Sequence, residues 1–292
     1  MRTNFSGVIT LTSPLAHGAD EKMGVDTKFR RIVHMVDGKT EEIPTVSGNS
    51  IRGVMRRLIA YDYIQRLGLE KQGISDKLYY TLFSGGALEK GSVVDHINVG
   101  TRREMREMIP FLSVWGGAVG NQIMSGKLIV ENAIPICMET MAYTGKESIL
   151  SYWDCLQEVY MTRRDDLEDN SRQEGEQATQ MKYTIECLVP GTRLQHGFVI
   201  FDCNAIEAAC FRFALHLWMR DACIGGKSAV GLGRFEADYD AGDYQGYMDY
   251  VEENKEKMQK YIQQIDGAKT QKKEPKPKSK KGTIDWEEDK GE

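Results

Sequence analysis

The stretch GGKSAVGLGRF, residues 225–235, has four glycines within nine positions, a density that excludes a helix. The preceding residues, Asn204 to Arg220, have the apolar periodicity of a helix, and Leu232 to Ala237 have the pattern of a strand. Glycine-rich backbone can approach a phosphate closely because no Cβ stands in the way. Lys227 and Ser228 add a cation and a hydroxyl. The stretch therefore predicts an anion-binding connection between a helix and a closing strand.

A nucleotide-binding P-loop is an alternative interpretation of Gly226-Lys227-Ser228, because the P-loop pattern ends in Gly-Lys-Ser/Thr. The first glycine of that pattern would fall on Asp221. A P-loop also follows a strand and precedes a helix, which is the reverse of the order here. These mismatches disfavour nucleotide hydrolysis. A plain helix-to-strand connection without a ligand is the other alternative that the residues leave open.

The rest of the chain has alternating strand and helix patterns. We expect, in order, a strand at 5–12, a helix at 51–66 begun by Ser47–Ser50, a strand at 126–136, a hairpin of strands at 182–188 and 194–202, a helix at 204–220 with Asn204 and Glu207 as capping box, and a strand at 232–237. With residues 143–181 set aside, strand, helix, hairpin, helix, strand is the ferredoxin-like (βαββαβ) order shared with RRM domains. The fold class is therefore α+β.

Five segments are expected along the chain. They are the first part of an RRM-like palm at 1–142, an inserted thumb at 143–181, the second part of the palm at 182–240, a C-terminal amphipathic helix at 241–266 and a disordered charged tail at 267–292. The insertion is indicated by an amphipathic stretch that runs into an acidic tract without aromatic residues. The tail is rich in lysine and proline and then acidic, a composition that predicts disorder.

The composition excludes several classes of protein. The chain has 292 residues, a net charge of −5 and no long apolar run, and its N-terminus lacks the apolar core of a signal peptide. Six scattered cysteines and five histidines show no metal-ligand spacing, so we expect a cytoplasmic protein without a metal site or membrane partner. Residues 28–57 hold seven Lys/Arg against three Asp/Glu. Phosphate contact requires such local basicity, so nucleic acid is not excluded.

Four pieces of the chain together resemble the RAMP superfamily of CRISPR-associated proteins. They are the loop 13–26, the helix start VSGNSIRG at 46–53, the insertion, and the glycine loop 225–234. The likeness covers residues 3–240 and is strongest to the backbone subunit that polymerises along guide RNA in type III and type IV effector complexes. His17-Gly18 with residues 46–53, and TRRDD at 162–166, resemble the type IV branch more than type III.

The resemblance implies a role in antiviral defence within a ribonucleoprotein complex. Copies of the chain would stack head to tail on the guide RNA (crRNA) as a helical filament and present it to a target nucleic acid, DNA or RNA, together with other CRISPR effector subunits. The thumb of one copy would fold over RNA held by its neighbour. A contact between unlike surfaces that does not close on itself gives such a filament.

The resemblance also implies that the helix start and the glycine loop lie near the guide backbone. Guide binding must ignore base sequence, so it requires phosphate and sugar contacts. A solvated basic helix face is the alternative interpretation of Arg52 and Arg56, which are four residues apart. The residues predicted to contact RNA are His17, Lys28, Arg30, Arg31, Asn49, Ser50, Arg52, Arg56, Arg163, Arg164, Gly226, Lys227, Ser228 and Arg234.

Cleavage of target RNA is the second hypothesis. In the type III branch an aspartate in the loop after the first strand supports metal-dependent cleavage, and Asp26 has a comparable place here, with Asp20 as second candidate. His17 could instead act as a general base. No partner base or second ligand is identifiable, and type IV-like backbones are not thought to cleave. We therefore expect a binding subunit without catalysis or cofactor, with Mg²⁺ needed only if the chain is an endoribonuclease.

Overall fold

The computed structural model describes residues 1–19, 26–70, 73–86, 99–119, 122–163 and 181–267. Its main sheet has the strand order β12-β1-β11-β7, with β8 also pairing with β11, and every pair is antiparallel. The strands are β1 (Arg2–Leu11), β7 (Leu128–Val130), β8 (Ile134–Pro135), β11 (Arg193–Phe201) and β12 (Phe235–Ala237).

Two long helices connect these strands. Helix α1 (Gly48–Arg66) lies between β1 and β7 in the chain, and α6 (Ala205–Asp221) lies between β11 and β12. The order β1, α1, β7, β11, α6, β12 is the ferredoxin-like order, and the α+β class is confirmed. The predicted capping box at the start of α6 is also confirmed, because the Glu207 N–H donates to Asn204 Oδ1 and the Asn204 N–H donates to Glu207 Oε2, both at 2.8 Å.

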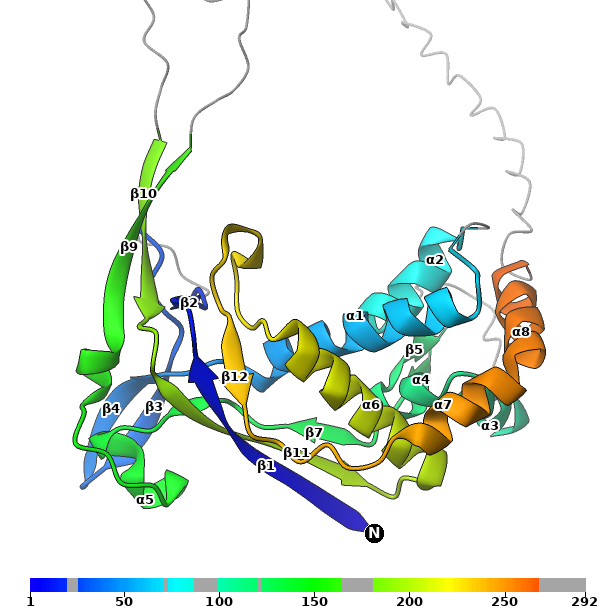
Figure 1. Cartoon of the computed structure of the whole chain (residues 1–292), viewed down its shortest axis with the longest axis horizontal. Coiled ribbons are helices and arrows are strands. Elements are labelled where there is room, and N and C mark those ends of the chain that lie inside the picture. Colours follow the sequence, from blue (N-terminus) through cyan, green and yellow to red (C-terminus); the bar gives the residue numbers. More distant parts are fainter. Residues whose placement is uncertain (20–25, 71–72, 87–98, 120–121, 164–180, 268–292) are drawn as a thin grey trace, which may run out of the picture.

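The predicted hairpin of residues 182–188 and 194–202 is wrong. Strand β10 (Met181–Leu188) pairs with β9 (Leu156–Arg163) and β2 (Leu15–Ala16) in a separate sheet, and this β9–β10 pair projects from the body of the molecule (Figure 1). The turn at 190–192 does not reverse the chain. β10 is antiparallel to β2 and β11 is antiparallel to β1, so β11 continues in the direction of β10, and the backbone of the turn bonds to Leu11 of β1. The neighbours of β11 are β1 on one side and β7 and β8 on the other, and β7 and β8 both fall within the predicted strand 126–136.

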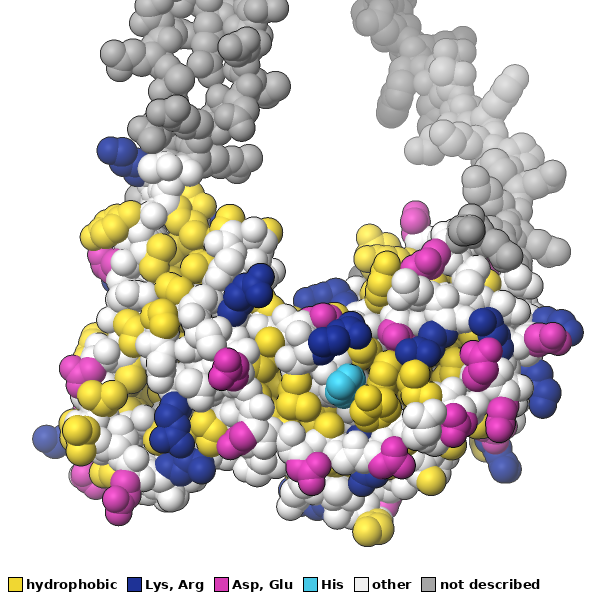
Figure 2. Space-filling view, in the orientation of Figure 1, with side chains coloured by type: hydrophobic (Ala, Val, Ile, Leu, Met, Phe, Trp, Pro, Cys, Tyr) yellow, Lys and Arg dark blue, Asp and Glu magenta, His cyan; other side chains and the backbone are white. Residues whose placement is uncertain are grey.

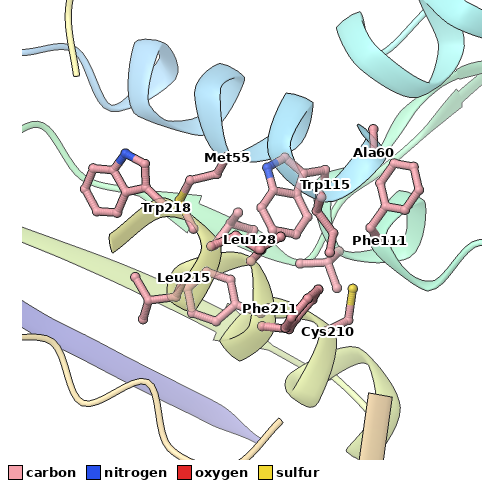
Figure 3. Packing of buried hydrophobic residues seen from close by; sticks show 14 of the residues in the cluster. Met55, Ala60, Phe111, Trp115, Leu128, Cys210, Phe211, Leu215 and Trp218 are labelled. Carbon is pink, nitrogen blue, oxygen red and sulfur yellow. The ribbon is translucent and has the colours of Figure 1, made fainter. Parts of the chain in front are cut away.

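Helices α1 and α6 pack together over one face of the main sheet. Phe5 and Phe198 face each other across β1 and β11 on that side, as do Ile9 and Leu194. Figure 3 shows the buried cluster between the helices and the sheet, with α4 (Pro110–Trp115) closing one end. The labelled members of this cluster are Met55, Ala60, Phe111, Trp115, Leu128, Cys210, Phe211, Leu215 and Trp218. This core fixes the position of the start of α1 relative to the sheet.

Shorter elements surround this core. Between β2 and α1 lies the hairpin of β3 (Arg31–Val36) and β4 (Lys39–Pro44). After α1 come α2 (Asp76–Tyr79), the π-helical η1 (Tyr80–Ser84), α3 (Val99–Met108), α4, β5 (Gly117–Val119) and β6 (Gln122–Met124). Further along are η2 (Met138–Thr140), α5 (Met141–Thr144), η3 (Tyr152–Cys155) and η4 (Ser228–Val230).

The C-terminal amphipathic segment forms two helices, α7 (Gln245–Glu253) and α8 (Lys255–Gly267), rather than one. The chain turns at Asn254, and the Asn254 side chain bonds to the carbonyl of Tyr250. The apolar faces of the two helices, with Tyr247, Val251 and Met258, are buried against the core. The predicted tail and residues 164–180 of the predicted thumb lie outside the described residues.

Candidate nucleic-acid interface

The glycine loop 225–235 and the start of α1 both contact one short segment, residues 13–18. The Gly226 N–H donates to the Ala16 carbonyl at 2.7 Å, and the Gly233 N–H donates to the Pro14 carbonyl at 2.8 Å. His17, the residue after Ala16, accepts a hydrogen bond at Nε2 from the Ser47 N–H at 3.1 Å. Consecutive residues of one segment therefore hold two stretches that lie far apart in the sequence.

Two glycines of the loop are required by its backbone. Gly225 has φ +75° and Gly233 has φ +81°, and a Cβ at either would collide with a backbone carbonyl, of Ala16 at Gly225 and of Ile224 at Gly233. Gly225 therefore lies directly against residues 13–18, and Gly233 lies directly against Ile224, the residue before the loop. The middle of the loop, from Gly226 to Val230, is left exposed.

The exposed part of the loop carries its polar side chains outward. Lys227 is in the left-handed conformation (φ 62°), and its Nζ lies 5.3 Å from the ring centroid of Tyr183 on β10. Ser228 is exposed, and so is Arg234, whose N–H donates to Ser13 Oγ at 2.9 Å. A cation held beside an aromatic ring keeps its ammonium hydrogens available to a further partner.

The start of α1 is arranged differently, because side chains of the protein itself accept the hydrogen bonds of its first N–H groups. Ser47 occupies the N-cap position, but its side chain makes no capping bond. The Ser47 N–H donates to His17, and the Gly48 N–H donates to Asn132 Oδ1 at 2.9 Å. Asn49 is exposed and Ser50 is half-exposed, so these two side chains reach the surface.

Arg56 is buried, with 7% of its surface exposed. Its guanidinium donates at 2.7–2.9 Å to the backbone carbonyls of Thr81, Leu82 and Gly116. Burial, and secondly the charge of Arg52, lowers the pKa of Arg56 to about 10. Arg52 is partly buried and donates to two further carbonyls, those of Trp115 at 2.6 Å and Leu128 at 2.7 Å. The two arginines share a face of α1, but this face is turned inward and ties the helix to η1, α4 and β7.

The basic run 28–31 lies against the β9–β10 sheet. Arg31 forms an ion pair with Glu186 at 2.8 Å, and its guanidinium lies 5.9 Å from the ring centroid of Trp153. Lys28 Nζ is 3.9 Å from the Glu158 carboxylate. Arg30 is half-exposed, and its N–H donates to the His17 carbonyl at 2.8 Å. Arg163 is the last residue of β9 before the undescribed residues, which include Arg164.

Asp26, the candidate catalytic residue, is exposed. Asp20, the second candidate, lies outside the described residues. No group of three or more His, Cys, Asp or Glu side chains that could hold a metal ion occurs in the part of the chain that the structure describes. The Nε2 of His17, which a general base would use, accepts the hydrogen bond from the start of α1.

The sequence did not single out two residues beside this site, Asn132 and Tyr183. Asn132 lies in the break between β7 and β8, where Val46 and Ala133 exchange backbone hydrogen bonds. That break turns its amide toward Gly48. Tyr183 belongs to the alternating apolar face of β10, with Ile185 and Cys187. The sequence predicted a strand at 182–188, but no local pattern indicates that this face meets Lys227.

Figure 2 shows the molecule notched between the β9–β10 projection and the helical part, with Lys and Arg side chains beside the notch. In Figure 1 the η4 turn of the glycine loop rises at the side of the notch next to β2 and β10. The exposed polar side chains of the loop therefore lie beside a concave part of the surface. Among the described helices, none is long and apolar enough to span a membrane.

Comparison of the chain with protein-family models and with curated proteins found no match. Among solved structures, a chain of a "Type IV-B CRISPR Complex" has a similar fold, with a TM-score of 0.62 and 25% sequence identity. The match covers 82% of this chain and 91% of that chain. A likeness of this extent supports a component of a CRISPR effector complex.

Proposed function

We propose that the chain is a backbone subunit of a CRISPR effector complex of the RAMP type, which binds guide RNA without reading its sequence and assembles in several copies along it. The similarity to a chain of a Type IV-B CRISPR complex over most of both chains carries this proposal. A ferredoxin-like sheet with a projecting β9–β10 pair supports it, since the resemblance seen in the sequence implies a palm and a thumb. The proposed complex is cytoplasmic and contains other effector subunits and a target nucleic acid.

The proposed phosphate contacts are the exposed groups on the glycine loop and at the start of α1. Binding that ignores sequence is supplied by cations, hydroxyls and backbone N–H groups directed at phosphate and sugar. The groups that fit are on Asn49, Ser50, Gly226, Lys227, Ser228 and Arg234. His17, Lys28 and Arg30 lie on the adjoining segments, and Arg163 and Arg164 would add contacts at the tip of the projection. Arg31, Arg52 and Arg56 hold the fold instead.

The test is the RNA content of the full-length protein purified with a CRISPR array co-expressed. Lys227→Glu with Arg234→Glu is expected to remove the co-purified RNA without changing the melting temperature. In titrations with single-stranded RNA, replacing each cation by a neutral residue is expected to reduce the slope of log K against log salt by about 1. Lys257→Glu with Lys260→Glu, on exposed positions of α8, makes the same change in net charge and is expected to retain the RNA. Unchanged RNA content in the loop variant would refute the assignment.

The endoribonuclease alternative is separated from the proposal by a second experiment. The purified complex is incubated with RNA complementary to the guide and with Mg²⁺. We expect the complementary RNA to be bound and left intact. Regularly spaced cuts that Asp26→Ala abolishes would replace the binding proposal with metal-dependent cleavage.

A further inference from the structure

Two hollows meet at Arg193, which follows the turn between β10 and β11 and lines both of them. The larger, of about 540 Å³, has an apolar part formed by Ile136, Ile149 and Leu150. Ile149 is 91% exposed and Leu150 is 51% exposed, so these apolar side chains have no cover in the described part of the chain. Exposed apolar groups gathered in a hollow mark an interaction site.

The smaller hollow, of about 270 Å³, has the opposite character. Glu236 and Asp238 line it together with Val8, Thr10 and Arg193. Glu236 is exposed at the middle of β12, and Asp238 is exposed just after that strand. The surface therefore has an acidic part, one arginine and an apolar part in sequence along it. Glu147 and Asp154 also line the larger hollow, beside its apolar part.

Residues 268–292 of this chain have a matching order of side chains. Between Ala268 and Lys281 there are seven lysines and one glutamate. Ile284 and Trp286 follow, and they are the only large apolar residues from 268 to 292. Asp285 and Glu287 flank Trp286 and supply negative charge beside the apolar pair.

We propose that the tail segment 272–289 of a second copy binds in the two hollows. The lysines lie over Glu236 and Asp238, the acidic residues beside Trp286 meet Arg193, and Ile284 with Trp286 cover Ile149 and Leu150. Lys281 and Trp286 are five residues apart, which spans about 17 Å of extended chain. Exposed ion pairs add little individually, so the tryptophan, with about 200 Å² of surface to bury, supplies most of the affinity.

The position of the tail in the molecule favours a second copy as its source. Figure 1 shows α8, after which residues 268–292 follow, at one end of the long axis, whereas α5, which precedes the segment 147–150 in the chain, lies toward the other end. A tail that leaves one end of a copy and binds near the opposite end of the next is a contact between unlike surfaces, which propagates along an assembly. None of the residues proposed to bind RNA takes part, so this contact and RNA binding can fail separately.

The first test uses a fluorescein-labelled peptide of residues 268–292 and the full-length chain carrying Trp286→Ala, which leaves the hollow free. We expect saturable binding that weakens at least tenfold when Ile149→Asp is added to the receptor or when the peptide carries Ile284→Ser and Trp286→Ser. Val99→Asp, at an 85% exposed position on α3 away from both hollows, is the matched control and is expected to leave binding unchanged. Equal effects of Ile149→Asp and Val99→Asp, or no binding, would overturn the proposal.

A second test identifies the copy that supplies the tail. A photo-crosslinking amino acid replaces Trp286 in the full-length chain, and the products are separated by mass after irradiation. We expect dimer-mass products whose crosslinked peptides include residues 147–155. Products of monomer mass alone would overturn the assignment to a second copy. The RNA content of the Ile149→Asp variant is expected to be that of the unchanged protein, which separates this result from failure of the proposed RNA site.

Discussion

The start of α1 and the glycine loop contain the same residue types, glycine, serine and cations, but use them in opposite ways. In α1 the guanidinium groups of Arg52 and Arg56 donate to five backbone carbonyls of neighbouring elements. In the loop, Lys227 and Arg234 are exposed. Backbone carbonyls in η1, at the end of α4 and in β7 require donors, and an arginine with five N–H groups can serve several at once. A basic residue beside such carbonyls is therefore used by the fold, whereas one on an exposed loop is available to a ligand.

The largest expected effect comes from removing the Arg56 side chain from the inward face of α1. Arg56→Ala leaves three buried carbonyls without a donor, so we expect the free energy of unfolding to fall by about 4 kcal/mol. Urea denaturation followed by circular dichroism measures it. Arg57→Ala, at the exposed neighbouring position, is expected to change stability by less than about 0.5 kcal/mol. Similar small losses in both variants would make Arg56 a candidate RNA contact again.

The buried histidine His196 gives a second comparison between side chains enclosed by the fold and side chains open to solvent. His196 is buried, with Nδ1 2.6 Å from the Tyr239 hydroxyl, and burial lowers its pKa to about 3. In the unfolded chain this histidine binds a proton near pH 6.5, whereas in the folded chain it stays neutral to a much lower pH. The free energy of unfolding therefore falls as the pH drops below 6.5, by about 2 kcal/mol at pH 5.

Urea denaturation of His196→Gln at pH 7 and pH 5 tests this dependence. The variant is expected to lack the fall, because its side chain does not titrate. His216→Gln, on the half-exposed side of α6, is the control and should keep the fall seen in the unchanged protein. A fall of equal size in His196→Gln would assign the acid sensitivity to another group.

Two glycines of the loop give an internally matched comparison. Gly231 has φ +86°, and no atom lies within 4 Å of the place that a Cβ would occupy, so Gly231→Ala costs only the left-handed backbone, about 1 kcal/mol. Gly233→Ala adds a collision with the Ile224 carbonyl, and we expect a loss of about 2 to 3 kcal/mol. Thermal unfolding of the two variants measures the difference. Equal losses would show that the loop can relax away from Ile224.

The smallest effect concerns the contact between Lys227 and Tyr183. A cation beside an exposed aromatic ring contributes about 0.5 to 1 kcal/mol. A double-mutant cycle with Tyr183→Leu and Lys227→Met is expected to give a coupling energy in that range for the stability of the RNA-free protein. A coupling near zero would mean that Lys227 is not held by the ring before RNA binds.

The local patterns of the sequence were sufficient for several elements. The apolar spacing at 51–66 and the capping pair Asn204 and Glu207 predicted α1 and α6, and alternation predicted β1 and β11. These signals lie within one element, because caps and periodicity depend on residues three or four apart. The α+β class followed from their order.

Pairings between distant residues could not be predicted in the same way. The turn at 190–192 indicated a hairpin, yet β10 pairs with β9 and β2, and β11 continues in the same direction along β1. The amide of Asn132 reaches Gly48 only because the chain breaks between β7 and β8. Each of these contacts depends on a backbone group contributed by another part of the chain.

The sequence by itself determined a helix, a glycine-rich loop and a closing strand, and it placed Lys227, Ser228 and Arg234 on that loop. Glycine density and helix periodicity are local properties, so these features could be deduced without the fold. Only the tertiary structure decided that Arg52 and Arg56 point inward while Lys227 and Arg234 stay exposed. The physical reason is that the fate of a cation depends on which carbonyls need a donor nearby, and those carbonyls come from elements distant in the sequence.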